Sequence, residues 1–296
     1  MVSTQQQVRG NDPLDPDRKQ PRAHGGLVRT DRTISIAWIG DLTFSEEIAR
    51  SLATSGKRAA WPFEDITSCL RESDLVVANL EGPTRQSVAE RRTNVALHLS
   101  NHPDIMQWLA KHSPCVANLA NNHTMDYGTT GLAGTREDAR RNGVLTVGAG
   151  MDATDAATPA VIDVGNLRIG LLAATSAARH VNAVVATPGR PGCASFDTTE
   201  QIIEATRSLR TRTDAVCVML HWGHEYYEFP SPGQRGLAHA LVDAGATCVI
   251  GTHPHVLQGM ERYHDSLIAY SLGNFFFPRV RYASGRYQVP KRLSRR

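Results

Sequence analysis

The chain has 296 residues, 41% of them apolar, and its 32 Lys and Arg against 29 Asp and Glu leave a formal charge of +3. This is enough chain for a sizeable core, and so small a net charge does not favour a nucleic-acid-binding protein. No stretch approaches the roughly 18 consecutive apolar residues of a membrane span, and the polar N-terminus lacks the apolar region of a secretory signal. The five cysteines form no CxxC pair, which argues against a zinc knuckle and a disulfide framework. We therefore expect a cytoplasmic protein.

The two ends of the chain differ from its centre in composition. Residues 1–32 are rich in Gln, Asp, Arg, Gly and Pro and offer little to bury, so we expect them to be disordered. Residues 279–296 contain seven Lys and Arg and no acid. This basic tail is either a solvated end or a contact for an acidic polymer, nucleic acid or anionic lipid. A single domain is expected between residues 33 and 278.

Within that domain, short β-branched apolar runs alternate with helical stretches, the pattern of an α/β fold. The strands expected in chain order are Thr33–Ile39, Leu75–Leu80, Cys115–Leu119, Val144–Val147, Leu167–Ala174, Ala215–Leu220, Thr247–Ile250 and Leu267–Tyr270. The expected helices are Glu46–Ala53, Asp104–Lys111, Thr130–Asn142, Thr199–Thr211 and Gln234–Ala244, the last ending at Gly245. Continuous apolar runs such as DAVCVML predict strands covered on both faces, as in largely parallel sheets.

Five of the expected strands are followed by side chains that commonly bind metals. These are Asp41, then Glu81, then Asn121, Asn122 and His123, then His221, and finally the pair His253 and His255. Ligands in open α/β sheets bind at the carboxyl ends of strands, where the loops converge. We therefore expect these side chains to share one site.

The residue types indicate which metal such a site would take. Carboxylate, amide and imidazole donors without thiolates suit Mn, Fe or Zn better than Ca or a cysteine-rich structural zinc. Six or seven donors exceed the three or four of a mononuclear catalytic site. They would serve two ions that share a bridging carboxylate. The sequence therefore predicts two divalent metal ions of undetermined identity.

Not every histidine is expected to be a ligand, because a single histidine at a strand end is more often a hydrogen-bonded structural residue. That interpretation is preferred for the seven histidines that form no recognisable sequence pattern with another candidate ligand: His24, His98, His102, His112, His180, His239 and His264. His253 and His255 differ, because Pro254 stiffens the loop between them and residues i and i+2 of an extended segment point the same way. No GxSxG elbow or glycine-rich P-loop occurs, so serine or cysteine nucleophiles are not supported.

Six segments together resemble one known family. In chain order they are GDLTF at 40–44, NLEGP at 79–83, ANNHTMDYG at 120–128, HWGHEYYEFPSPGQ at 221–234, IGTHPHVLQG at 250–259 and YSLGNFFF at 270–277. The series resembles the capsule synthesis protein CapA family, of the poly-γ-glutamate biosynthesis CapA/PgsA type. That family is similar to the calcineurin-like metallophosphoesterase superfamily. The resemblance covers about 33–278 and implies a four-layer αββα sandwich with two metals at the strand ends.

The resemblance also implies a role for individual residues. The implied metal ligands are Asp41 on the first metal, Glu81 bridging the two, Asn122, His221 and His253 on the second, and His255 on the first again. His123 would be the general acid beside the leaving group, oriented by Asp126. The residues implied to line a substrate pocket are Trp222, His224, Glu225 and Asn274.

The sequence departs from the family pattern at three points. Thr43 stands where the superfamily usually has a histidine ligand, and the bridging acid is Glu81 where the wider superfamily uses aspartate, which weakens the first metal's ligand set. The CapA pattern also continues past SLGNF with further strands, so the second sheet is expected to lack C-terminal strands, which would leave an edge that is either exposed or covered by a partner. Family members often carry an N-terminal membrane anchor, which this sequence does not show.

Two functions are consistent with these features. The first is a metal-dependent hydrolase of capsule or poly-γ-glutamate metabolism, acting on a phosphoester or a γ-glutamyl amide through a metal-bridging hydroxide. The second is a non-catalytic accessory subunit of a poly-γ-glutamate synthase or exporter that binds the acidic polymer. The partners expected are an acidic small molecule or γ-glutamyl polymer and capsule-synthase subunits, with no specific nucleic acid.

Overall fold

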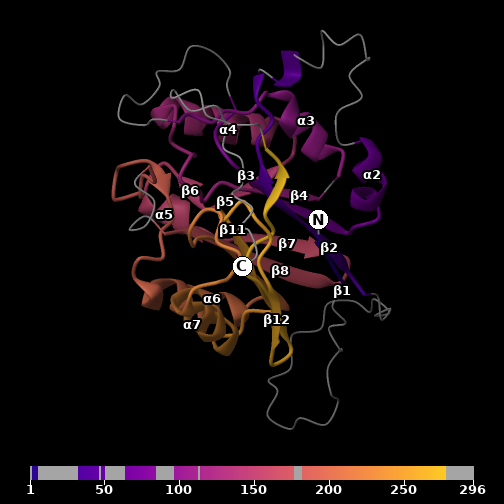
Figure 1. Cartoon of the computed structure of the whole chain (residues 1–296), viewed down its shortest axis with the longest axis vertical. Helices are drawn as coiled ribbons and strands as arrows, with labels where there is room; N and C mark the ends of the chain where they lie inside the picture. The colour runs from indigo at the N-terminus through magenta and orange to yellow at the C-terminus, as the bar shows by residue number, and fades with distance from the viewer. Residues whose placement is uncertain are drawn as a thin grey trace, which may run out of the picture.

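A computed structural model of the chain describes residues 2–5, 33–46, 48–50, 64–84, 97–112, 114–176 and 182–277. This part of the chain is built on two six-stranded sheets that pack face to face, with helices on their outer faces (Figure 1). The N-terminal half of the chain supplies most of the first sheet, and the C-terminal half most of the second.

The first sheet is largely parallel. Its strands are β1 (Val2–Gln5), β2 (Ser35–Leu42), β3 (Leu75–Leu80), β4 (Cys115–Asn118), β5 (Leu145–Val147) and β14 (Asn274–Phe276). The order is β1-β2-β3-β4-β5, and β14 also pairs with β2. All of these pairs are parallel except β1 with β2, so the carboxyl ends of β2, β3, β4 and β14 lie at one edge.

The second sheet is parallel in its centre and antiparallel at both sides. Its strands, in spatial order, are β12 (Met260–Tyr263), β13 (Ser266–Ala269), β11 (Cys248–Thr252), β10 (Ala215–His221), β8 (Leu167–Thr175) and β7 (Ala160–Val164). A separate two-stranded sheet joins β6 (Ala149–Gly150) and β9 (Gly192–Cys193). Strands β10 and β11 are parallel neighbours and therefore end side by side.

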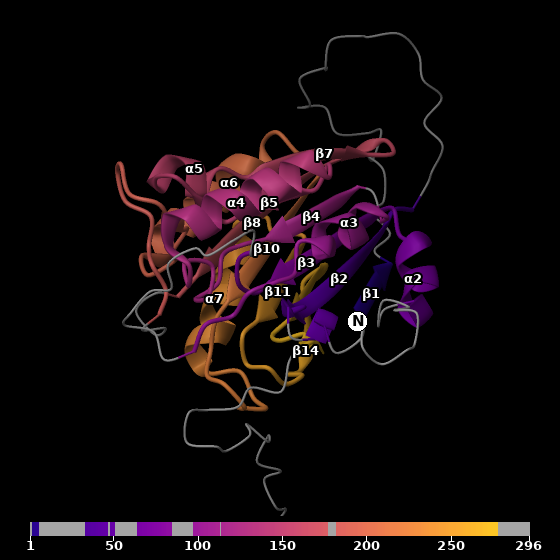
Figure 2. The same ribbon diagram turned by 90° about the horizontal axis from the view of Figure 1, so that it is seen from above.

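The helices form the two outer layers. They are α2 (Glu64–Arg71), α3 (Asp104–Ala110), α4 (Gly128–Arg141), α5 (Ala153–Ala157), α6 (Thr199–Arg210) and α7 (Pro232–Asp243). Figure 1 shows α3 and α4 on one side of the paired sheets and α6 and α7 on the other. In the view from above, α2 lies beside the β1–β2 edge (Figure 2). None of the described helices is long and apolar enough to cross a membrane.

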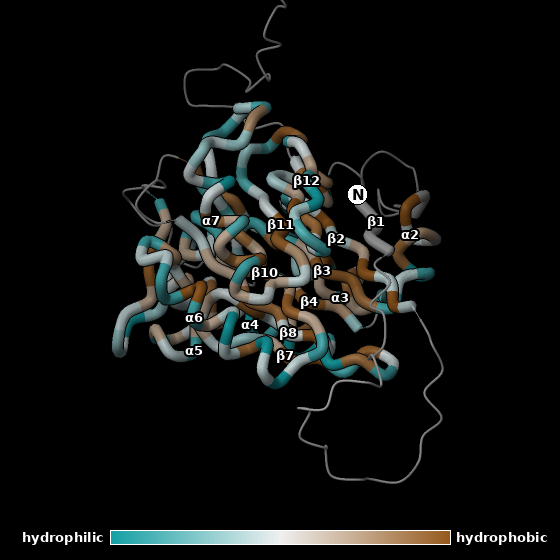
Figure 3. The backbone as a smooth tube through the Cα atoms, turned by 90° about the horizontal axis from the view of Figure 1, so that it is seen from below, coloured by the Kyte–Doolittle hydropathy of each residue, from teal (hydrophilic) through white to brown (hydrophobic). Residues whose placement is uncertain are grey.

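Successive side chains of each central strand pack on opposite faces of its sheet, and this alternation produces the layers. Val77 packs between the two sheets, whereas Val76 and Ala78 of the same strand pack with the buried face of α3. In β10, Cys217 packs between the sheets and Val218 packs against α6 and α7. Both faces of the central strands are thus covered, and apolar colour runs along them in Figure 3. The predicted four-layer αββα sandwich is confirmed.

The predicted elements agree best with the observed ones where a strand is buried on both faces. β3 spans the expected residues Leu75–Leu80, and β2, β10 and β11 continue one to three residues beyond their expected ends, into the polar positions. Edge strands β7, β12 and β14 and the short helices α2 and α5 were not expected. β7 alternates between exposed and buried residues over only five positions, too short a pattern to separate from a loop.

Helix α7 begins two residues before its expected start because of local capping. The side chain of Ser231 accepts a hydrogen bond from the backbone N–H of Gln234, whose side chain accepts one from Ser231 N–H in return. Pro232 occupies the first turn, where its missing N–H costs nothing. Gly245 follows the helix with φ of 106°, as expected for a glycine after a helix C-terminus.

Several predictions concern residues outside the described ranges. Of the expected helix Glu46–Ala53, residues 46 and 48–50 are helical and the rest lies outside. Within the N-terminal segment expected to be disordered, Val2–Gln5 instead pairs antiparallel with β2, and residues 6–32 lie outside the description. The basic tail 279–296 also lies outside it. The domain boundaries at 33 and 278 stay predictions.

Gly40 lets β2 and the segment before β14 approach each other closely next to Asp41. A Cβ at Gly40 would lie 2.1 Å from the carbonyl oxygen of Gly273, and that same oxygen accepts the backbone N–H of Asp41 at 2.9 Å. We expect Gly40→Ala to lower the free energy of unfolding by about 2–3 kcal/mol, since the backbone would have to shift. Gly134→Ala in α4 is the control: its Cβ would meet nothing within 4 Å, and we expect a gain of about 0.5–1 kcal/mol. Urea unfolding measures both, and equal stability of the two variants would contradict this interpretation.

Candidate metal centre

Five strand ends from the two sheets meet at one buried site. β2 and β3 bring Asp41 and Glu81, and the turn after β4 brings Asn122 and His123. β10 ends on His221, and the loop after β11 carries His253 and His255. The most enclosed of these side chains are Asp41, Glu81 and His221, each 0% exposed. A parallel arrangement of the strands in each sheet is what places these residues together.

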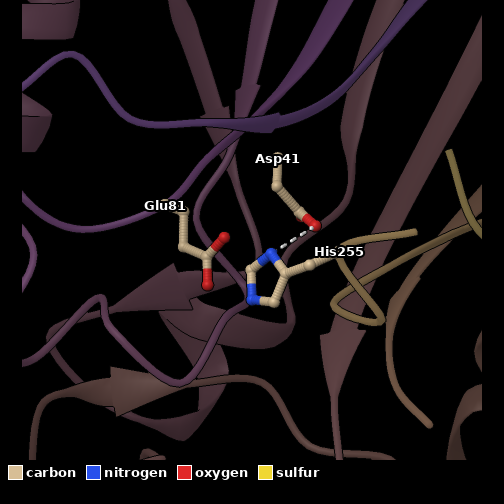
Figure 4. Close-up of side chains that lie close together, drawn as sticks. All are labelled: Asp41, Glu81 and His255. Atoms are coloured by element: carbon tan, nitrogen blue, oxygen red, sulfur yellow. Dashed lines mark ion pairs between the residues drawn. The ribbon is translucent and has the colours of Figure 1, made fainter. Parts of the chain in front are cut away.

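The first group of donor atoms belongs to Asp41, Glu81 and His255. One ligand atom of each lies within 4.8 Å of the other two, and the three side chains point toward one another (Figure 4). Nδ1 of His255 is 3.3 Å from Oδ2 of Asp41. Two carboxylates and one imidazole form a donor set suited to a divalent cation.

The second group belongs to Asn122, His221 and His253. Nε2 of His221 lies 2.8 Å from Oδ1 of Asn122 and 3.2 Å from Nδ1 of His253. Nδ1 of His221 is hydrogen-bonded to the hydroxyl of Thr252 at 3.0 Å, which fixes the ring with Nε2 toward the other two. All three donors are among the residues that the sequence singles out, whereas Thr252, which orients one of them, is not.

Glu81 lies between the two groups. Its Oε1 is 3.9 Å from Nε2 of His221 and 4.0 Å from Nε2 of His123. Both carboxylate oxygens are buried without a hydrogen-bond partner among the described residues. Burial, and next the charge of Asp41, raise the pKa of Glu81 to about 8. A buried carboxylate whose oxygens accept no hydrogen bond from the described residues is the kind of group a bound cation satisfies.

Charge balance in the first group depends on His255. Burial alone would lower the pKa of this imidazole, but the carboxylates of Glu81 and Asp41 and a hydrogen bond to Asn274 together raise it to about 10. Oδ1 of Asn274 lies 2.7 Å from Nδ1 of His255. The protein on its own therefore holds a proton on His255, whose Nδ1 lies beside the carboxylate of Asp41.

His123 and Asp126 form a hydrogen-bonded pair at the edge of the site. Nδ1 of His123 is 2.7 Å from Oδ2 of Asp126, which also accepts the backbone N–H of Leu99 at 2.8 Å. Burial opposes protonation of His123, but the hydrogen bond and charge of Asp126 and the charge of Glu81 outweigh it, so its pKa is raised. The pair thus has the geometry of an imidazole oriented by a carboxylate, with Nε2 directed toward Glu81.

The backbone of the HPH loop differs from the expectation. His253 and His255 both have positive φ, 96° and 58°, and are not part of an extended segment. We predicted that both histidines face one site because residues i and i+2 of an extended chain point the same way. That reason was wrong. Both reach it because left-handed residues turn the loop, and non-glycine residues held in this strained region are concentrated at functional sites.

The side chain of Thr43 is not placed as a metal ligand. The residue is 0% exposed, and its hydroxyl donates to the backbone carbonyl of Glu81 at 2.9 Å. The side chain therefore ties β2 to the turn after β3. Nothing in this arrangement replaces the histidine that the superfamily resemblance leads one to expect at this position.

The four residues expected to line a substrate pocket lie in different surroundings. Trp222 is 1% exposed, packs with Tyr270 and Phe196, and donates its indole N–H to the Tyr270 carbonyl at 2.9 Å. This enclosure indicates a packing role and not a substrate contact. His224, Glu225 and Asn274 are exposed. Asn274 contacts His255, and the charge of Glu225 acts on Glu81, so these two border the site.

Comparison with known proteins identifies the family. The bacterial capsule synthesis protein family PGA_cap matches residues 35–279, most of the chain. The chain belongs to this family. The family resemblance deduced from the six motifs is thereby confirmed.

Two curated relatives agree with that assignment. The chain is 32% identical over 254 residues to the capsule biosynthesis protein CapA of Bacillus anthracis, covering 84% of this chain and 61% of that protein. It is 30% identical over 225 residues to a probable polyglutamine synthesis accessory protein of Mycobacterium tuberculosis, covering 72% and 59%. A hypothetical protein of Thermus thermophilus with a known crystal structure has a TM-score of 0.47 at 17% identity, covering 81% and 76%. The chain thus spans about three fifths of the length of these curated relatives.

Proposed function

We propose that this chain is a metal-dependent hydrolase of capsule or poly-γ-glutamate metabolism whose site holds two divalent ions. The observation that carries the proposal is Glu81, a fully buried carboxylate whose two oxygens have no hydrogen-bond partner among the described residues, between two groups of metal-type donors. A single ion in either group would leave donors of the other unused. Two ions bridged by Glu81 would engage both groups.

The donors suggest how the ions would be held. Asp41, Glu81 and His255 would bind the first, and Glu81, Asn122, His221 and His253 the second. Oxygen and imidazole nitrogen donors without thiolate suit Mn, Fe or Zn. The strained backbone at His253 and His255 supports this assignment, because strain is retained where a site requires a fixed geometry.

The chemistry follows from the chain's own groups. A pair of divalent ions, when bound, polarises the scissile bond and activates water. His123 would donate a proton from Nε2 to the leaving group, since Asp126 holds Nδ1 and raises the pKa of the ring. Protonation by a positioned acid matters most for a poor leaving group such as an amine or an alkoxide. The reaction class we propose is hydrolysis of a phosphoester or a γ-glutamyl amide.

The test compares substrate classes under controlled metal. The purified chain, loaded with Mn²⁺, is assayed with bis-p-nitrophenyl phosphate, p-nitrophenyl phosphate and γ-glutamyl-p-nitroanilide. We expect turnover of at least one class, abolished by EDTA and lowered on the order of 10²-fold or more in His253→Ala, since several kcal/mol of charge stabilisation are lost. His264→Ala is the control, because His264 is exposed and also has positive φ. Unchanged turnover in His253→Ala would contradict the proposal.

Metal affinity is expected to rise with pH. In the metal-free protein Glu81, with a pKa of about 8, and His255, with a pKa of about 10, hold protons at neutral pH. A metal ion must displace these protons, so binding releases them and strengthens as pH increases. From slightly acidic to slightly alkaline pH, we expect the dissociation constant for Mn²⁺ to fall by about tenfold per pH unit for each proton displaced. Competition with a chelator of known affinity measures this, and an affinity independent of pH would argue against these ligands.

A second function is favoured by two observations. The M. tuberculosis relative is named as a probable accessory protein of polyglutamine synthesis, and the hydroxyl of Thr43 is engaged with backbone where a histidine ligand is usual. In this case the site would bind metal or acidic polymer without turnover, and capsule-synthase subunits would be the partners. Robust metal-dependent catalysis by the isolated chain, with no synthase subunit recovered on co-purification, would exclude it.

A further inference from the structure

Four polar residues form a row across adjacent strands at the edge of the metal centre. Asn274 of β14 is in register with Asp41 of β2, Asp41 with Asn79 of β3, and Asn79 with Asn118 of β4. Asn79 and Asn118 lie in strands whose other residues are apolar, and they are 3% and 1% exposed. Asparagines so deeply buried require specific partners.

On one side of Asp41 the row is a directed chain of hydrogen bonds. The Asn118 carbonyl oxygen accepts the backbone N–H of Ala120 at 2.8 Å, so its amide nitrogen faces Asn79 and donates to Oδ1 of that residue at 3.1 Å. The Asn79 amide nitrogen then donates to Oδ1 of Asp41 at 2.8 Å. Because a backbone N–H can only donate, it fixes the orientation of both amides. Oδ1 of Asp41 is thereby occupied, and Oδ2, which accepts the backbone N–H of His253 at 3.2 Å, lies 3.3 Å from Nδ1 of His255.

On the other side of Asp41 the row orients His255. Oδ1 of Asn274, an acceptor, lies 2.7 Å from Nδ1 of His255. A hydrogen on Nδ1 would leave Nε2 with a free lone pair in the neutral ring. Figure 4 shows that second ring nitrogen on the side of Glu81. Asn274, together with Oδ2 of Asp41 at 3.3 Å from the same nitrogen, thus selects the tautomer and the ring orientation that a ligand from Nε2 requires.

We propose that Asn79 and Asn274 are positioning residues for the first metal, which orient Asp41 and His255 and compensate for a ligand shell in which Thr43 is no ligand. This inference rests on the proposed function, since it concerns the same site. It reassigns Asn274 from substrate contact to support of a ligand. Hydrogen-bond partners of metal ligands commonly change metal affinity by about 10–100-fold when removed.

Asn274 offers the sharper test, because it is exposed and its replacement leaves the core intact. Asn274→Leu has similar size but no acceptor, whereas Asn274→Asp keeps an acceptor for Nδ1–H. Mn²⁺ titration, with no substrate present, should give two equivalents in the unaltered chain. In Asn274→Leu we expect the weaker of the two Mn²⁺-binding steps to lose about 10–100-fold in affinity. In Asn274→Asp we expect the affinity of that step to stay within about threefold of the value for the unaltered chain. Asn166→Leu, in the exposed turn between β7 and β8, is the control and should match the unaltered chain.

Asn79→Asp tests the other half of the row by replacing the amide donor with a second carboxylate beside Asp41. We expect the same binding step to weaken by about tenfold or more, while thermal unfolding without metal reports whether the variant folds. If it does not fold, the Asn274 variants decide the matter alone. Unchanged Mn²⁺ affinity in Asn274→Leu, or a raised KM with full metal binding, would overturn the inference. Absence of metal binding in the unaltered chain would instead contradict the proposed function.

Discussion

Glu81→Gln is expected to abolish the stabilisation of the chain by metal while making the metal-free protein more stable. Both oxygens of Glu81 are buried and have no hydrogen-bond partner among the described residues, and burial together with the charge of Asp41 raises its pKa from 4.5 to about 8. Because the pKa of Glu81 is higher in the folded state than in the unfolded state, the native state binds the proton more tightly. The ionised residue therefore destabilises the fold increasingly as pH rises from about 5 to 8.

The effect of Glu81→Gln should consequently depend on pH. In EDTA we expect the variant and the unaltered chain to unfold at similar urea concentrations near about pH 5, and the variant to gain about 1–3 kcal/mol near about pH 8. Added Mn²⁺ at about 100 times its dissociation constant should stabilise the unaltered chain by about 2.7 kcal/mol and leave the variant unchanged. Glu228→Gln is the control, since that carboxylate is exposed. A full metal response in Glu81→Gln would show that Glu81 is not a ligand.

His123→Asn is expected to lower kcat by about 10²–10⁴-fold without changing metal content. His123 lies at the edge of the site, with Nε2 4.0 Å from Oε1 of Glu81 and Nδ1 bonded to Asp126. Loss of a general acid affects a poor leaving group more than an activated one. We therefore expect a large loss with an alkyl phosphoester or alkyl amide and a small one with the p-nitrophenyl analogue.

Metal analysis of the same sample separates this role from that of a ligand. If His123→Asn loses metal in parallel with activity, His123 is a ligand and not the acid. Asp126→Asn should cause a smaller loss of kcat and lower the pKa seen in the pH profile, because Asp126 acts on the reaction through the His123 ring. An equal loss for activated and unactivated leaving groups would contradict the assignment.

The sequence predicted the parts of the fold that two-sided burial determines. The run Leu75–Leu80 is apolar apart from Asn79 and forms β3 over the same residues. Edge strands such as β12 were missed because one side is exposed and the alternation is short. The site was predictable for a related reason: parallel strands gather their carboxyl ends, so a polar residue that follows an apolar run marks the edge where ligands bind.

Other features of the site depended on contacts that no linear pattern records. The left-handed backbone at His253 and His255 cannot be inferred from spacing, and Pro254 between them suggested an extended loop instead. Trp222 follows a site residue in the chain but packs on the opposite side, toward the helices. A signal for Asn79 and Asn118 did exist, since each is a lone polar residue within an apolar strand, but its meaning required the register of neighbouring strands.

The binuclear centre can be tested by elemental mass spectrometry, which gives the metal content of the chain purified without added metal beside that of His253→Ala. We expect close to two equivalents of Mn, Fe or Zn per chain, and a loss of one of them in His253→Ala, because Asp41, Glu81 and His255 remain. One equivalent or less in the unaltered chain, even after incubation with excess metal, would contradict a binuclear centre and favour the accessory, polymer-binding function.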